Sequence, residues 1–361
     1  MVKVYLKEAS DSWHLVGNPS SVLEVLDLGN DDSYTEWDDS MPEFGGKLAF
    51  ATAIANNSTL KVINFGGWSN SFTTSEWQTV LSILRHNSIE EIYLYGQQIG
   101  VEGMNSIALG LSNNTSLKKL DLGDCGGVTF ACLASLSDEI QNNRASALET
   151  LDISSHITRR ELTTSITRIL IDNTSLKELS LCGQWDTRDD IIIELANVLE
   201  NNDTLKVLNL GTLSSGIRQH HIDKDQSFGF KALTRILCNR SSVDATFMSN
   251  HTLQIVSVYI QHRHVYQSAV LPSHLKDMLQ LNGNDNKFEV SRQKILQCHF
   301  DETEFVKMEL EVLPHALAWC GEDQRGVSLL YRLVKSQASL FDPNSKKRNK
   351  AGATTKRKRN E

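Results

Sequence analysis

Apolar residues recur along the chain in one short pattern. The stretch from Thr115 to Val128 shows it best, with leucines at Leu117, Leu120 and Leu122, the last two alternating with polar residues. Such alternation predicts a short β-strand with one apolar face. Equivalent triplets are Leu23, Leu26, Leu28; Leu60, Ile63, Phe65; Ile89, Ile92, Leu94; Leu148, Leu151, Ile153; Leu176, Leu179, Leu181; Leu205, Leu208, Leu210; and, more weakly, Leu253, Val256, Val258.

The copies are evenly spaced. From Leu60 to Leu205, five intervals cover 145 residues, which gives a mean period of 29 residues. A repeat of this length predicts one extended body of stacked units instead of several separate domains.

Helical apolar spacing fills the segments between the strand copies. The clearest case places apolar side chains on one face at Ile191, Ile192, Leu195, Val198 and Leu199. Thr73, Thr74 and Ser75 precede another such segment and predict an N-cap. Each unit is thus a strand, a loop, a helix and a turn. We expect parallel strands on a concave face and helices on a convex face, since the helix layer is the wider one.

Asparagine recurs at the predicted helix ends. Asn adopts the left-handed conformation more readily than most residues, so we interpret these positions as helix C-caps. The Asn-x-Ser/Thr pattern that several of them form is not read as glycosylation, because the N-terminal segment lacks the apolar core of a signal peptide. The positions are Asn56–Asn57, Asn87, Asn113–Asn114, Asn142–Asn143, Asn173, Asn201–Asn202 and Asn239.

Two units are nearly identical in sequence. Residues 114–122 read Asn-Thr-Ser-Leu-Lys-Lys-Leu-Asp-Leu, and residues 173–181 read Asn-Thr-Ser-Leu-Lys-Glu-Leu-Ser-Leu. They resemble leucine-rich repeats, and the period is similar to that of the ribonuclease-inhibitor-like class. The resemblance covers about residues 20–260 and implies an α/β solenoid. The family often has Asn or Cys three residues after the last strand leucine. Here only Cys125 matches, and the other slots hold Asp31, Trp68, Gln97, His156, Gln184 and Leu213.

The predicted organisation has four parts. Residues 1–20 would form an N-terminal cap, and residues 21–260 a solenoid of about seven to eight repeats. Residues 261–342 lose the period, and their helical apolar spacing predicts a helical C-terminal subdomain. Residues 343–361 carry no large apolar side chain and are predicted to be a disordered basic tail.

Composition and charge narrow the function classes. No run of 18 apolar residues exists, so no membrane span is expected. The six cysteines lack CxxC spacing, which favours reduced thiols and an intracellular location. Residues 345–361 carry a charge of +7. Because the net charge of the chain is −8, the other 344 residues carry −15. An acidic body makes nucleic-acid binding unlikely except through the tail.

The basic tail resembles nuclear-localisation signals. Its second cluster is Lys356, Arg357, Lys358 and Arg359, which would suffice for an import signal of the one-part form. We therefore expect an import receptor as one partner and a nuclear or nucleocytoplasmic location. The alternatives are non-specific nucleic-acid binding by the tail and no function at all.

No motif for catalysis, cofactors or metals is present, so we expect a protein that is not an enzyme and binds none of these. Gly46-Lys47 lacks the rest of a nucleotide-binding loop. His220-His221 and His262-Arg-His264 have no further ligand at metal spacing. Cys125, Cys132 and Cys182 lie on or beside strands and are interpreted as small buried hydrophobes.

The strand pattern also predicts the residues of the concave face. The residue between the last two strand leucines should point outward, which gives Asp27, Asn64, Tyr93, Asp121, Asp152, Ser180, Asn209 and Ser257. Exposed Tyr and Trp are typical interface anchors. We interpret the face as a site for a basic or mixed protein partner; the alternative is a solvated surface without a ligand. The predicted contact residues are Trp68, Tyr93, Tyr95, Asp121, Asp124, Asp152 and Trp185.

We consider two functional hypotheses. The first is an interaction module or scaffold that binds a protein partner through the concave face and the ascending loops. The second, by analogy of fold alone, is a regulator of a small GTPase of the activator kind. A GTP-hydrolysis assay with a panel of small GTPases separates them.

Overall fold

The computed structural model describes part of the 361-residue chain. The predictions for Trp68, Trp185, Cys182, His220–His221 and the basic tail fall outside the described residues. The described residues are 2–5, 16, 23–29, 47–67, 72–154, 159–181, 189–212, 227–262, 265–268 and 270–299.

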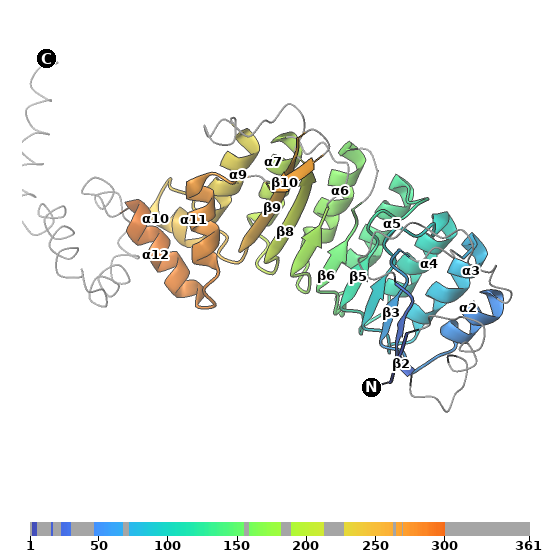
Figure 1. Cartoon of the computed structure of the whole chain (residues 1–361). Coiled ribbons are helices and arrows are strands. Elements are labelled where there is room, and N and C mark those ends of the chain that lie inside the picture. The colour runs from blue at the N-terminus through green and yellow to red at the C-terminus, as the bar shows by residue number, and fades with distance from the viewer. Residues whose placement is uncertain are drawn as a thin grey trace, which may run out of the picture. The chain divides into compact units, whose positions relative to one another are not determined.

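The described strands form one sheet in chain order, from β1 to β10 (Figure 1). β1 to β9 are all parallel, and β10 runs antiparallel to β9. The predicted parallel sheet is confirmed. The strands are β1 Val2–Tyr5, β2 Leu23–Asp27, β3 Val62–Asn64, β4 Glu91–Tyr93, β5 Lys119–Asp121, β6 Thr150–Asp152, β7 Glu178–Ser180, β8 Val207–Thr212, β9 Ile255–His262 and β10 Val265–Ser268.

Helices alternate with the strands, and those from α2 to α7 pack in sequence against one another on one face of the sheet (Figure 1). The fold is therefore of the α/β class. The helices are α2 Lys47–Ala55, α3 Thr74–Leu81, the 3-10 helix η1 Ser82–Arg85, α4 Gly100–Leu111, α5 Phe130–Asn142, α6 Arg159–Leu170, α7 Asp189–Leu199, α9 Phe228–Leu237, α10 Val243–Phe247, α11 Ser273–Asn282 and α12 Lys287–His299.

The core lies between the sheet and the helices. Leu120 in β5 and Leu151 in β6 are fully buried, as is Leu195 in α7. The other apolar residues of the triplets are buried too, except Leu28, which is partly exposed, and burial of each such side chain contributes about 1.5–3 kcal/mol. Near α3, the Phe65 and Trp77 rings meet edge to face with centroids 5.4 Å apart. The predicted one-sided strands are confirmed in β3 to β6, where only the middle residue is buried, whereas in β7 the predicted outward residue Ser180 is buried as well.

Helix α3 begins at the predicted cap. The Thr73 N–H donates to Glu76 Oε2 at 2.8 Å, and the Glu76 N–H donates back to Thr73 Oγ1 at 3.4 Å. This reciprocal pair is a capping box. The prediction of an N-cap at this position is confirmed.

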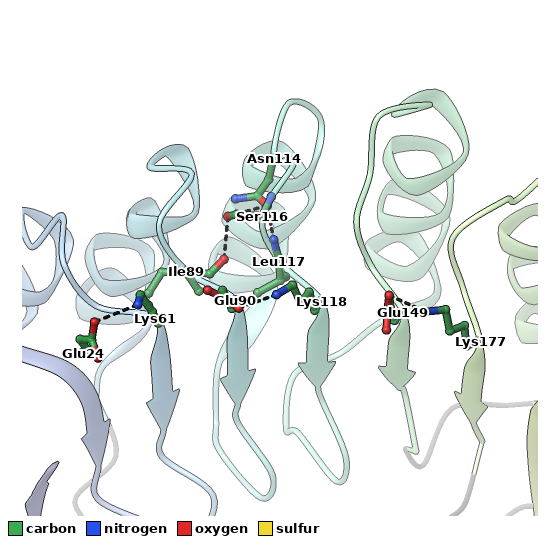
Figure 2. A network of polar contacts seen from close by, with 10 residues as sticks. All are labelled: Glu24, Lys61, Ile89, Glu90, Asn114, Ser116, Leu117, Lys118, Glu149 and Lys177. Carbon is green, nitrogen blue, oxygen red and sulfur yellow. Dashed lines mark hydrogen bonds and ion pairs between the residues drawn. The ribbon is translucent and has the colours of Figure 1, made fainter. Parts of the chain in front are cut away.

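The asparagines at the helix ends act through their side chains, not through a left-handed backbone. Among the described non-glycine residues, only Asp124 and Asp172 have a positive φ, so the predicted left-handed caps are wrong for the described asparagines. Asn114 shows the reason (Figure 2): its Oδ1 accepts from the N–H groups of Ser116 and Leu117 at 3.0 and 2.8 Å. Asn57, Asn173 and Asn202 hold the next strand in the same way.

The chain divides into two compact units. The first contains residues 1–236 and 252–283, and the second contains residues 237–251 and 284–361. Residues 252–283 lie in the first unit, and the domain boundary at residue 260 stays a prediction. β10 falls within the segment that was predicted to be helical. It forms a strand there because the edge of β9 offers unpaired backbone groups, with which β10 pairs. Within the described ranges, no helix is both long enough and apolar enough to cross a membrane.

Candidate functional site

The strand register lines up the predicted outward residues in one row across the sheet. Asp27 pairs with Asn64, Asn64 with Tyr93, Tyr93 with Asp121, and Asp121 with Asp152. Neighbouring strands lie roughly 4.8 Å apart, so these side chains are immediate neighbours. Because the flanking leucines face the helices, the row lies on the opposite face of the sheet.

Tyr93 is held firmly in this row. Its hydroxyl donates to Glu91 Oε2 at 2.6 Å, and Lys119 Nζ lies 4.7 Å from its ring centroid. Burial, followed by the hydrogen bond to Glu91, raises the pKa of the Tyr93 hydroxyl. The Tyr93 side chain is therefore held by contacts on its own strand and on the neighbouring strand, and its hydroxyl stays protonated at neutral pH.

Tyr95, Asp121 and Asp152 converge above Gly123. A Cβ atom added to Gly123 would lie 3.0 Å from Tyr95 Cδ2, 3.1 Å from Asp121 Oδ1 and 3.6 Å from Asp152 Oδ1. The Tyr95 side chain is 51% exposed. The lack of a side chain at Gly123 thus leaves an aromatic ring and two carboxylates facing one small space. We call Tyr93, Tyr95, Asp121 and Asp152 the tyrosine–aspartate patch.

The carboxylates of the patch affect one another. Burial raises the pKa of the Asp121 carboxyl, and the charges of Asp152 and Asp124 raise it further. The hydrogen bond from the Gly123 N–H and the charge of Lys119 lower it. Negative charge is therefore concentrated at a cost in free energy. A cation placed between these groups would offset that cost.

Asp121 and Asp152 also have a structural role that the sequence analysis missed. Asp121 Oδ1 accepts from the Gly123 N–H at 2.9 Å, and Asp152 Oδ1 accepts from the Ser154 N–H at 2.9 Å. Asp27 and Asn64 make the same turn with the residue two positions on. An Asp or Asn followed two residues later by Gly or Ser is the signal for such a turn. Part of the acidity of this row therefore serves to end the strands.

Asp124, the other described member of the predicted site, lies in the loop after β5. Its φ is 50°, in the left-handed region, and its N–H donates to the Ser154 carbonyl at 2.6 Å. Its charge acts on Asp121. The structure thus brings the two tyrosines and two aspartates together and places Asp124 beside them. Trp68 and Trp185 lie outside the described residues.

The opposite ends of the strands carry paired charges. Figure 2 shows Lys61 with Glu24, Lys118 with Glu90, and Lys177 with Glu149, at 2.8, 2.6 and 2.6 Å. Each pair joins a glutamate to the lysine of the next unit. Such exposed pairs contribute little to stability, and they neutralise each other.

The loop position three residues after the last strand leucine is used more often than predicted. Cys125 Sγ donates to the Leu94 carbonyl at 3.0 Å, as expected of the matching residue. Gln97 Nε2 donates to the Phe65 carbonyl at 2.8 Å from the same slot one unit earlier. Gln97 is 2% exposed, so a glutamine performs the same task as the cysteine.

The described cysteines of the repeats are poorly suited to act as nucleophiles. Cys125 and Cys132 are buried, and burial raises the pKa of the Cys125 thiol to about 12. In the described part of the chain, no three His, Cys, Asp or Glu side chains are grouped as a metal ion would require.

The chain was compared with known proteins. No protein-family model matches it, and no curated protein matches it significantly.

Proposed function

We propose that the chain is a leucine-rich-repeat solenoid of the ribonuclease-inhibitor-like class that serves as a protein-interaction module. The regular period near 29 residues and the single-register parallel sheet support this class. The sheet face without helices would be the concave binding face. The partner would bind at the tyrosine–aspartate patch.

The convergence of Tyr95, Asp121 and Asp152 above Gly123 carries this proposal. An arginine or lysine of the partner could stack on the Tyr95 ring while its nitrogen atoms donate to the two carboxylates. A cation–π contact contributes about 0.5–2 kcal/mol, and each charge-assisted hydrogen bond about 1.5–3 kcal/mol. The favoured ligand is therefore a basic segment of a protein.

Asparagine substitutions test the patch sharply. Asp121→Asn and Asp152→Asn keep the side-chain oxygen that accepts from Gly123 and Ser154, but they remove the charge. The full chain would be screened against an array of peptides in which single positions are Arg, Lys or their neutral counterparts. We expect bound peptides to be enriched in Arg and Lys. The double variant, or Tyr95→Ala, should weaken binding at least about tenfold.

Asp27→Asn is the matched control. Asp27 occupies the same row and makes the same turn with Gly29, but it lies three strands away from Asp121. It should leave peptide affinity unchanged. Peptide binding that is indifferent to the patch substitutions, or equally sensitive to Asp27→Asn, would reject this surface.

The basic tail supports a second element of the proposal, entry into the nucleus through an import receptor. A fluorescent fusion with Lys356, Arg357, Lys358 and Arg359 all replaced by alanine should lose nuclear enrichment. Equal distribution of the parent and the variant would remove this element without affecting the patch.

A further inference from the structure

Two cysteines that are far apart in sequence meet in the second compact unit. Cys238 Sγ and Cys298 Sγ lie 3.2 Å apart, although 60 residues separate them in the chain. Cys238 follows the last residue of α9 and is buried, whereas Cys298 lies in the last turn of α12 and is partly exposed. One sulfur atom of the pair is therefore accessible from solvent, and its partner is shielded.

The surroundings distinguish the two thiols. A hydrogen bond from Cys238 is the main cause that lowers the pKa of Cys298, to about 6, and the hydrogen bond and charge of Arg240 lower it further. The pKa of Cys238 is raised, first by the same hydrogen bond and then by burial. These effects favour Cys298 as the thiolate and Cys238 as the protonated donor of the pair.

A buried lysine fixes this arrangement. Lys294 Nζ donates to the carbonyl oxygens of Leu237 and Asn250 at 2.6 and 3.0 Å and approaches His251 Nδ1 at 3.1 Å. Lys294 is fully buried and lies one helical turn before Cys298, on the same side of α12. It therefore ties α12 to the segment that carries Cys238. Burial lowers the pKa of Lys294 to about 7, and its charged form favours the Cys298 thiolate.

We propose that Cys298 and Cys238 form a reversible peroxide-reactive pair, with Cys298 as the attacking and Cys238 as the resolving cysteine. The Cys298 thiolate attacks one oxygen of hydrogen peroxide, so that an S–O bond forms and the O–O bond breaks. The hydroxide that leaves takes up a proton and becomes water. The product is a sulfenic acid, with sulfur oxidised and peroxide reduced by two electrons.

The second step closes the disulfide. Cys238 loses its proton and attacks the Cys298 sulfur, so that the S–S bond forms, the S–O bond breaks and a second water leaves. The proton from Cys238 is taken up by the departing hydroxide. Two molecules of a small thiol such as glutathione restore both thiols by exchange and leave joined as their own disulfide. The starting distance of 3.2 Å requires only a small approach to the roughly 2.05 Å of a disulfide.

Mass spectrometry of the full chain tests the pair directly. The protein would be treated with a few equivalents of hydrogen peroxide, alkylated with N-ethylmaleimide and digested without reductant. We expect a peptide pair joined through Cys238 and Cys298 that dithiothreitol separates. Cys125 and Cys132 should remain alkylatable after unfolding. If peroxide leaves both thiols of the pair free, or joins Cys298 instead to Cys182 or Cys320, the proposal is overturned.

Substitutions assign the roles. Cys238→Ser should leave a persistent sulfenic acid on Cys298 that dimedone traps, whereas Cys298→Ser should abolish oxidation of Cys238. Arg240→Gln should slow oxidation about tenfold, because it removes a hydrogen bond to the thiolate. Arg235→Gln is the matched control, since Arg235 is an exposed arginine in the last turn of α9. Equal slowing by both arginine variants would contradict the assigned role of Arg240.

Discussion

Asn114 Nδ2 donates a hydrogen bond of 2.8 Å to the carbonyl oxygen of Leu84, a residue of the preceding unit. The same side chain accepts from the N–H groups of Ser116 and Leu117 through Oδ1. One buried side-chain amide therefore forms hydrogen bonds both with a carbonyl at the end of one helix and with N–H groups at the start of the next strand. This explains why asparagine stands at this point in unit after unit.

Removal of the amide should destabilise the repeats. Asn114→Ala leaves one carbonyl and two N–H groups without their partner in a buried turn, at a cost of about 2–4 kcal/mol. Urea denaturation measures the loss of stability, and amide hydrogen exchange at Ser116 and Leu117 measures it locally. Both amides should exchange markedly faster in the variant.

Asn113 provides the control for this prediction. It is exposed, and its amide donates to Ser112 Oγ at 3.1 Å. Asn113→Ala should therefore change stability by less than about 0.5 kcal/mol. If the two alanine variants unfold alike, the bridging role of Asn114 is wrong.

Local patterns predict the sheet, because a strand with one buried face must alternate apolar and polar residues. Leu117, Leu120 and Leu122 could be assigned in this way, and all are buried. The role of the asparagines could not, since it depends on carbonyl groups about 30 residues away, such as Leu84 O. A propensity for left-handed backbone was therefore the wrong physical argument.

The candidate site was predicted in part for the same reason. Alternation alone identifies Tyr93, Asp121 and Asp152 as neighbours on the outward face, and the register confirms this. The convergence above Gly123 depends on the direction of the Tyr95 side chain, which no spacing rule supplies. The pairing of Cys238 with Cys298 joins segments that are 60 residues apart and lies beyond any local pattern.

Two glycines of α4 should respond differently to alanine. At Gly110 an added Cβ would lie 2.5 Å from the Leu84 Cβ, which requires α4 and η1 to separate. Gly110→Ala should therefore destabilise the protein by about 1–3 kcal/mol. Thermal unfolding, followed by circular dichroism, provides the measurement.

Gly103 is the matched position on the same helix. Its added Cβ would meet the side chains of Ile99, Trp77 and Leu81 at 3.3–3.6 Å, close to ordinary contact. Alanine also favours the helix by about 1 kcal/mol relative to glycine. Gly103→Ala should leave stability unchanged or slightly raised. If Gly103→Ala lowers stability as much as Gly110→Ala does, the space around the added Cβ does not determine the change in stability.

Binding at the tyrosine–aspartate patch should weaken with salt. The Asp121 and Asp152 carboxylates are close to the surface, so added ions screen their attraction for a basic ligand. For a peptide that binds through one arginine, affinity should fall several-fold between about 50 and 500 mM NaCl, because the Debye length shortens from about 14 Å to about 4 Å. Fluorescence anisotropy provides the measurement. For the Asp121→Asn, Asp152→Asn double variant, the remaining affinity should depend far less on salt.

His251 should remain neutral well below its usual pKa. Its Nε2 lies 2.9 Å from the Phe247 carbonyl, and its Nδ1 faces Lys294 Nζ at 3.1 Å. Only the tautomer with the proton on Nε2 satisfies both contacts, because the ammonium donates to Nδ1. Burial first, and then the charge of Lys294, lower the pKa of His251 to about 4. Nitrogen–proton correlation spectra should show this tautomer down to about pH 5.

The lowered pKa sets the sign of the effect on stability. Between about pH 6.5 and pH 4, the unfolded chain binds a proton at His251 that the folded chain does not, so folding stability decreases as pH falls through this range. Lys294→Met removes the neighbouring charge and should move the pKa of His251 part of the way back toward 6.5. Lys287→Met is the control, since the charge of Lys287 is the smallest of the causes that lower it. Equal shifts in the two variants, or a parent His251 that titrates above pH 6, would contradict the contact between Lys294 and His251.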